Sequence, residues 1–175
     1  MKAPILFVWV FLAFACGGPG GTQEQALPEE GNAVAATATV LDLAPYDTPL
    51  LVDLGDLAIL GVDSPMVKWN EVLGQLEVWA GEHFGLLITE EPGDLARLKA
   101  DLDRDMLRKH TVVEQTPERF VYRSEFPDDA GTYLHFYLTV HVGERSFVVT
   151  DMEQHQYNEA DMRRMVNAVK AKPAV

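Results

Sequence analysis

Residues 132–151 read TYLHFYLTVHVGERSFVVTD, and apolar side chains alternate with polar or aromatic ones through most of this stretch. Alternation with a period of two is typical of a strand that places one face in the core. Gly143-Glu144 supplies a two-residue turn, so the two halves are predicted to pair as an antiparallel hairpin with Val140 opposite Phe147. One face of the first strand should therefore enter the core, and its residues are Leu134, Phe136, Leu138, Val140 and Val142.

The other face of residues 132–142 carries aromatic rings with polar tips. Such rings are common where a surface is partly covered and partly wet. Two interpretations stay open, namely that a helix covers this face or that part of it is an open binding surface. The candidate binding residues are Tyr133, His135 and Tyr137.

More strands are predicted on the N-terminal side of this hairpin. The sequence alternates at 111–116 and 119–125, and short alternating runs around residues 67–71, 76–80 and 84–88 are separated by glycine-containing turns. Antiparallel hairpins that follow one another along the chain form a meander.

Two helices interrupt the strands. Asp94 is a predicted N-cap, and His110 is expected to close that helix. A second helix begins at Asn158, where Asp161 makes an imperfect capping box. Each helix has an apolar stripe at three- and four-residue steps: Leu95, Leu98, Leu102 and Met106 in the first, and Met162, Met165, Val166 and Val169 in the second.

This order of elements predicts a single α+β domain over residues 39–175, an antiparallel β-sheet built from hairpins with two flanking helices. The order over about residues 76–170 resembles the PsbP-like fold, an α/β/α sandwich. That resemblance rests on element order alone. Members of that superfamily are mostly accessory or binding proteins, but a shared fold does not by itself carry function.

An export signal is predicted for residues 1–15. Lys2 precedes thirteen uncharged, mostly apolar residues, a run too short to cross about 30 Å of hydrocarbon as a helix. The end of the run, Ala13, Ala15 and Cys16, resembles the bacterial lipobox, although Leu12 lies one position earlier than the usual leucine. The resemblance implies cleavage before Cys16, diacylglycerol on its sulfur and acylation of its new N-terminus.

An ordinary signal peptidase site also fits Ala13-Phe14-Ala15, and it would be cut at the same bond. On that alternative Cys16 carries no lipid. Gly17 is not the aspartate that retains lipoproteins at the inner membrane of enteric bacteria. We therefore expect an anchor that faces the periplasm, with the outer membrane favoured over the inner. The whole chain also resembles a small bacterial lipoprotein family, which implies no activity.

Residues 16–38 are predicted to form a flexible tether between the lipid and the domain. They are rich in Gly, Pro, Ala, Gln and Glu and contain almost no large apolar side chain. Such a composition cannot bury enough surface to order itself. The predicted partner of this end of the chain is the membrane, reached through the lipid.

Composition limits the partners of the domain. The 175 residues include 14 Lys and Arg against 27 Asp and Glu, for a net charge of −13. A body this acidic repels phosphate backbones and anionic lipid headgroups, so nucleic acid is excluded as a partner. Apolar residues make up 47% of the chain, enough for a core.

No motif indicates a cofactor or a metal. Asp101–Asp105 has the acidic spacing of a calcium loop, but Met106 and Val112 occupy the positions that need glycine and glutamate. The five histidines follow no metal-binding spacing. The chain has no nucleotide-binding or hydrolase motif, and Cys16 is its one thiol.

The sequence thus favours a non-catalytic binding or accessory module of the cell envelope, with a protein, a peptide or a small ligand as its partner. The alternative is an envelope hydrolase whose site assembles only in three dimensions. A deep pocket that holds a perturbed carboxylate or histidine would favour the hydrolase, and a shallow apolar face the binding module.

Overall fold

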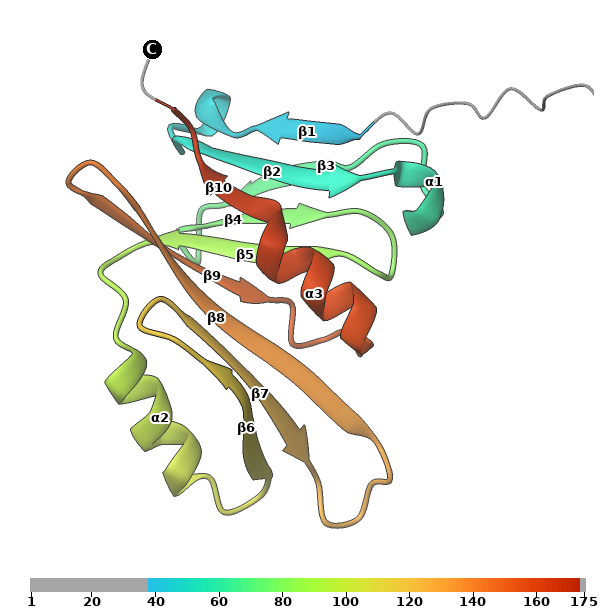
Figure 1. The fold of residues 1–175 in the computed structure, drawn as a ribbon, viewed down its shortest axis with the longest axis vertical. Coiled ribbons are helices and arrows are strands. Elements are labelled where there is room, and N and C mark those ends of the chain that lie inside the picture. Colours follow the sequence, from blue (N-terminus) through green and yellow to red (C-terminus); the bar gives the residue numbers. More distant parts are fainter. Residues whose placement is uncertain (1–37, 174–175) are drawn as a thin grey trace, which may run out of the picture. The chain divides into compact units, whose positions relative to one another are not determined.

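Two antiparallel sheets form the framework of the computed structural model, which describes residues 38–173 (Figure 1). The larger sheet has seven strands in the order β3-β4-β5-β9-β8-β7-β6. Two meanders, β3 to β5 and β6 to β9, are joined by the pairing of β5 with β9. The predicted α+β class with a meander sheet is confirmed. The strands are β3 (Met66–Asn70), β4 (Gln75–Trp79), β5 (Gly85–Glu90), β6 (Lys109–Gln115), β7 (Arg119–Glu125), β8 (Thr132–Val142) and β9 (Arg145–Asp151).

The β8–β9 hairpin has the register expected from its sequence. Val140 lies opposite Phe147, and Gly143 turns the chain with a φ of 61°. Phe136 is 1% exposed in the core, and the other apolar residues of that face are buried or pack against the core. The predicted inward face of this strand is therefore confirmed.

A second, smaller sheet was not expected from the sequence. Its order is β1-β2-β10, and all of its pairs are antiparallel. The last strand continues directly from the final helix and has only three residues, too few for an alternation to show. The elements are β1 (Thr39–Asp42), the 3-10 turn η1 (Ala44–Tyr46), β2 (Leu50–Gly55), the one-turn helix α1 (Leu57–Leu60) and β10 (Val169–Ala171).

One of the two longer helices lies across the large sheet, and the other lies beside its β6–β7 end (Figure 1). The second helix shares a hollow with outer-face residues of the sheet, whereas the first borders inner-face residues. Helix α3 (Glu159–Ala168) contacts β2 and β8, and its apolar stripe, including Met162 and Met165, is buried in the main core. Helix α2 (Leu95–Arg104) has no fully buried residue, and Leu98 faces Tyr122 on the outer side of the sheet. The prediction of two flanking helices is thus confirmed.

Helix α2 ends earlier than its apolar stripe predicts. The carboxylate of Asp105 accepts hydrogen bonds from the backbone N–H groups of Leu107 and Arg108, at 2.8 and 3.2 Å, and these bonds fold the chain into a turn. Met106, predicted to lie in the buried stripe, is 96% exposed beyond the helix. His110 does not close a helix but lies in β6.

None of the helices within residues 38–173 is both long enough and apolar enough to cross a bilayer. The predicted signal segment, Cys16 and almost all of the tether lie outside the described residues. Those predictions stay predictions.

Candidate functional site

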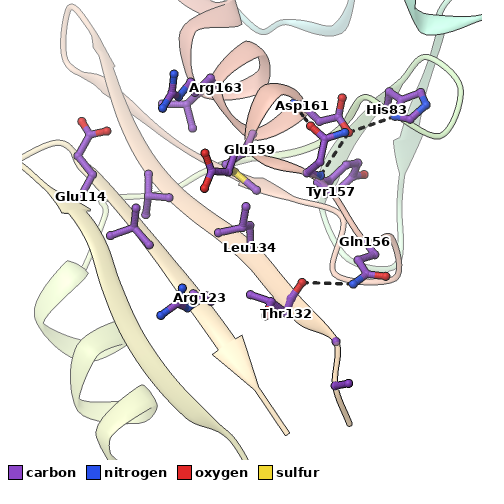
Figure 2. A pocket seen from close by; sticks show the side chains of 17 residues that line it. His83, Glu114, Arg123, Thr132, Leu134, Gln156, Tyr157, Glu159, Asp161 and Arg163 are labelled. Atoms are coloured by element: carbon purple, nitrogen blue, oxygen red, sulfur yellow. Dashed lines mark hydrogen bonds and ion pairs between the residues drawn. The ribbon is translucent and has the colours of Figure 1, made fainter.

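An open groove of about 860 Å³ runs between α3 and the inner face of β6, β7 and β8 (Figure 2). We call it the α3 groove. It exists because the large sheet extends past α3: Val121 on β7 is still buried in the core, whereas Arg123 on β7 and Val113 on β6 are 42% and 58% exposed. The apolar part of its lining is Val113, Val121, Leu134, Met162 and Val166.

Each wall of the groove is fixed by an ordinary packing rule. Val121 and Arg123 are two residues apart on β7 and therefore share the inner face. Met162 and Val166 are one helical turn apart on α3, and both are at most 5% exposed. A β-bulge at Val113 interrupts the β6–β7 register, and this side chain lines the groove.

Two arginines supply positive charge to the α3 groove. The Nε of Arg123 forms an ion pair with the Glu125 carboxylate at 3.4 Å, although this buried atom makes no hydrogen bond among the described residues. The Arg123 side chain is nevertheless 42% exposed, so its guanidinium can be reached from the groove. Arg163, on α3, forms no ion pair within residues 38–173.

The carboxylates of the groove are mostly engaged within the chain. Glu114 pairs at 3.3 Å with Arg119, a residue that does not line the groove. Asp161 closes the capping box of α3, so the imperfect box predicted from the sequence is complete. Glu159 has no ion pair in the described part of the chain. Arg163 and the exposed end of the Arg123 guanidinium, beyond its pair with Glu125, are therefore the positive charges best placed for an anionic ligand group.

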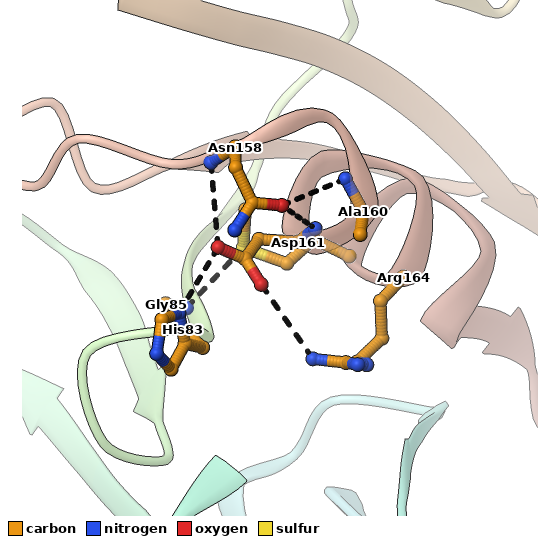
Figure 3. Close-up of polar contacts among 7 residues, drawn as sticks. His83, Gly85, Asn158, Ala160, Asp161 and Arg164 are labelled. Carbon is orange, nitrogen blue, oxygen red and sulfur yellow. Dashed lines mark hydrogen bonds and ion pairs between the residues drawn. The ribbon is translucent and has the colours of Figure 1, made fainter. Parts of the chain in front are cut away.

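The N-terminal end of α3 is locked to the loop between β4 and β5 (Figure 3). The Nδ1 of His83 lies 3.1 Å from Oδ2 of Asp161, and Nη1 of Arg164 lies 3.7 Å from Oδ1. The N–H of Gly85 donates to the sulfur of Met165 at 3.3 Å. These contacts hold the helix wall of the groove in place before any ligand binds.

The three candidate binding residues lie on the opposite, outer face of the sheet. Tyr133 donates to Asp129 at 2.6 Å, and this bond raises the pKa of Tyr133 and lowers that of Asp129. The Tyr137 hydroxyl accepts from the Asp94 backbone N–H at 2.8 Å, and burial raises its pKa. His135 is 5% exposed and bonds to the buried Asp151 at 2.9 Å.

A second hollow, of about 490 Å³, lies beside α2 on that outer face. Tyr137 and Leu98 line it, whereas Tyr133 and His135 do not. The structure therefore brings only one of the three candidate residues to a cavity, and all three polar tips already bond within the chain. Whether this face binds a ligand stays a prediction.

Ser124, His110 and Asp105 form a contact chain that resembles a hydrolase triad. The Nε2 of His110 lies 3.1 Å from the Asp105 carboxylate, and Nδ1 lies 2.9 Å from the Ser124 hydroxyl. Arg108 holds the pKa of Asp105 well below its usual range, and two backbone N–H groups and His110 contribute to the shift. A neutral His110 would then carry its proton on Nε2 and accept from Ser124.

Access argues against chemistry at Ser124. It is 0% exposed and is paired on both sides in the ladder, opposite His110 and Tyr133. A serine nucleophile needs a substrate path and free N–H donors for the developing oxyanion. Local sequence did not indicate these contacts, because Asp105 and Ser124 are brought together only by the fold.

Sequence reasoning missed the two groove arginines. A signal was present in β7, because among its four inward positions only Val121 is apolar, and the charged ones are Arg119, Glu125 and Arg123. Its cross-strand neighbour on β8 is Leu134, one of the predicted core positions. An arginine in such a row indicates an uncovered part of the inner face.

The fold and the α3 groove define the class, an α+β domain with an open amphipathic groove. No cluster of three or more metal-ligating side chains occurs in the part of the chain that the structure describes. Comparison of the chain with protein-family models, with curated proteins and with solved structures finds no match.

Proposed function

We propose that this protein is a lipid-anchored, non-catalytic binding protein of the cell envelope, attached through Cys16 and binding its ligand in the α3 groove. The groove itself carries the proposal, because an apolar floor, Arg163 without an ion pair among the described residues, and the partly exposed Arg123 beside Glu125 suit a ligand with both apolar and anionic parts. Its volume lies within the 300–1,000 Å³ that is typical of ligand sites. No cofactor takes part.

Attachment by lipid fits a domain with this charge. A net charge of −13 opposes adsorption to anionic headgroups, so a covalent anchor is the means that the sequence offers for keeping the domain at a membrane. We place the anchor at the periplasmic face of the outer membrane, in preference to the inner membrane.

Replacement of Cys16 by serine tests the anchor. The variant should move from the membrane to the soluble periplasmic fraction with its domain folded, and the wild-type protein should carry about three acyl chains by mass spectrometry. An unmodified cysteine at the mature N-terminus would refute this half of the proposal.

The groove is tested with 8-anilinonaphthalene-1-sulfonate, a fluorescent probe with an apolar ring system and one anionic group. Saturable binding to the full chain in detergent is expected, with affinity about tenfold lower in Arg123→Gln, a loss of about 1.4 kcal/mol. Arg97→Gln is the matched control, because it removes the same charge from an 80% exposed side chain of α2. Equal binding by both variants would remove the groove from consideration.

The hydrolase alternative is supported by one observation, the Ser124–His110–Asp105 contact chain. A fluorophosphonate probe, which labels activated serines, separates the two functions. No labelling of Ser124 is expected, because its hydroxyl is fully buried. Labelling that disappears in Ser124→Ala would replace the binding function with a catalytic one.

A further inference from the structure

Resting on the proposed function, we infer that the occupant of the α3 groove is an extended acidic peptide segment of another envelope protein. The segment adds as a strand to the free edge of β6 and places a carboxylate side chain against Arg123. Three features of the described residues carry this inference: an open sheet edge, a row of side chains that leads from that edge to Arg123, and a second cation on the helix wall.

The open edge is β6. Within residues 38–173 it has a strand partner on one side only, β7. The bulge at Val113 leaves residues 109–112 as an uninterrupted stretch of regular pairing. Val112 and Val113 are 54% and 58% exposed, so the edge also offers apolar side chains. A peptide strand at such an edge gains main-chain hydrogen bonds, and pockets beside it select side chains.

A row of side chains connects this edge to Arg123. Leu134, Arg123 and Thr111 are direct cross-strand neighbours on β8, β7 and β6. The next position in the row belongs to the added strand, about 4.8 Å beyond Thr111. Because threonine is short and arginine is long, the Arg123 guanidinium can reach over Thr111 to a carboxylate at that position.

Charge complementarity makes the peptide acidic. The Nε of Arg123 is buried and pairs with Glu125 at 3.4 Å, whereas the side chain as a whole is 42% exposed, so a peptide carboxylate would bind the terminal nitrogens of the guanidinium. Arg163 adds a second positive charge from the opposite wall. The body as a whole is acidic, so the attraction is confined to the groove and should weaken with salt.

The shape of the groove favours a peptide over a lipid. A fatty acyl chain has no polar groups along its length, so it needs apolar walls on nearly all sides. The α3 groove is open to solvent, and one of its sides is the backbone edge of β6. A peptide satisfies that edge, whereas an acyl chain leaves it bare.

A displayed library of random nine-residue peptides, selected against the full chain in detergent, tests the inference. Enriched peptides should alternate apolar residues with one Asp or Glu at a fixed position. Arg123→Gln should weaken the best peptide at least tenfold, and Arg97→Gln should change its affinity by less than twofold. Selection on Arg123→Glu should move the preference at that position to Lys or Arg. Bound peptide should slow amide exchange at residues 109–112.

Other outcomes separate the two proposals. Suppose that oleate displaces the naphthalene probe from the wild type but not from Arg123→Gln, and that no peptide is enriched. This result would overturn the inference of a peptide occupant and leave the proposed binding function standing. Equal binding of a synthetic peptide of residues 22–37 would make the occupant this chain's own segment and overturn the external partner. Selected peptides without an acidic position would overturn the role of Arg123. If the wild-type protein bound neither the naphthalene probe nor any selected peptide, both proposals would be refuted.

Discussion

The Asp151 side chain takes the place of the backbone hydrogen bonds between β8 and β9 at the point where the two strands separate. The last cross-strand pair at this end is Tyr137 with Thr150. Beyond it, one Asp151 oxygen accepts from the Phe136 backbone N–H at 2.8 Å and the other contacts the His135 ring at 2.9 Å. Asp151 is 2% exposed, so its removal would leave two buried polar groups without this partner.

Replacement of Asp151 by alanine should lower the free energy of unfolding by about 3 kcal/mol, because breaking one side of a buried polar pair leaves the other side uncompensated. Asp151→Asn keeps an oxygen for the Phe136 N–H and should lose less. Urea unfolding followed by circular dichroism measures both variants. Equal losses would mean that the negative charge, and not the backbone acceptor, is what matters at this position.

Asp105, in the turn after α2, is one of the carboxylates that make the stability of the protein depend on pH in the acid range. Its hydrogen bond to Arg108, followed by those from Leu107 and His110, lowers its pKa in the folded state. A lowered folded pKa means that its contribution is complete above the unfolded value of about 3.9 and is lost as the pH falls through the folded value.

The variant Asp105→Asn should therefore show a shallower fall in stability between pH 5 and pH 2 than the wild type. Carboxylates with lowered pKa values elsewhere, including Glu90 and Asp129, keep some slope in both proteins. Urea midpoints at pH 5, 4, 3 and 2 give the comparison. Parallel curves would show that the Asp105 contacts do not distinguish the folded from the unfolded state.

Helix α3 depends on its first turn, which is also one end of the groove. The Asn158 side chain accepts from the N–H groups of Ala160 and Asp161 at 2.8 and 3.0 Å, and Asp161 accepts from the Asn158 N–H at 3.3 Å. This reciprocal pattern satisfies three backbone donors that the helix itself cannot.

Replacement of Asn158 by alanine should cost about 1 kcal/mol of stability. Asn158→Asp retains an acceptor beside the positive end of the helix and should remain near the wild type, which makes it the matched control. Thermal unfolding measures both variants. A wild-type melting temperature for Asn158→Ala would show that packing of the buried face holds α3 without its cap.

At the scale of elements, the sequence predicted the strands and helices that have long periodic patterns or a clear cap. It missed the elements that are short or that depend on long-range pairing. The β8–β9 register and the start of α3 follow from long alternation and from a cap. Helix α2 ends early because Asp105 competes for the backbone, a local choice that the apolar stripe extending to Met106 conceals. The small sheet was missed because β10 is short and because its pairing with β2 spans more than a hundred residues.

At the scale of the whole molecule, the α3 groove results from unequal layers. The large sheet has seven strands, and the layer on its inner face consists of the small sheet and α3. This layer covers Val121 on β7 but leaves Arg123 and β6 partly exposed (Figure 1). Inward alternation predicted an apolar face on β8, but it could not show where the cover ends. The inward charges of β7 indicated part of this limit, but the place of Arg163 on the opposite wall follows only from the fold. The candidate face of Tyr133, His135 and Tyr137 was selected from strand alternation and side-chain type, neither of which shows whether a surface is open.

If the lipid anchor and the folded domain are separate parts, as proposed, the tether between them can be removed without loss of the fold. Strand β1 begins at Thr39, directly after the predicted tether, and pairs with β2 from its first residue. Deletion of residues 17–38 from a soluble form carrying Cys16→Ser should shift the melting temperature by no more than about 2 °C, because changes outside packed structure usually stay within about 0.5 kcal/mol. A drop of about ten degrees would mean that the segment packs as structure, and that the domain begins before Thr39. Probe binding by the shortened protein then supplies a second measure: affinity equal to that of the full-length Cys16→Ser protein is expected if the groove is built from residues 83–166 alone.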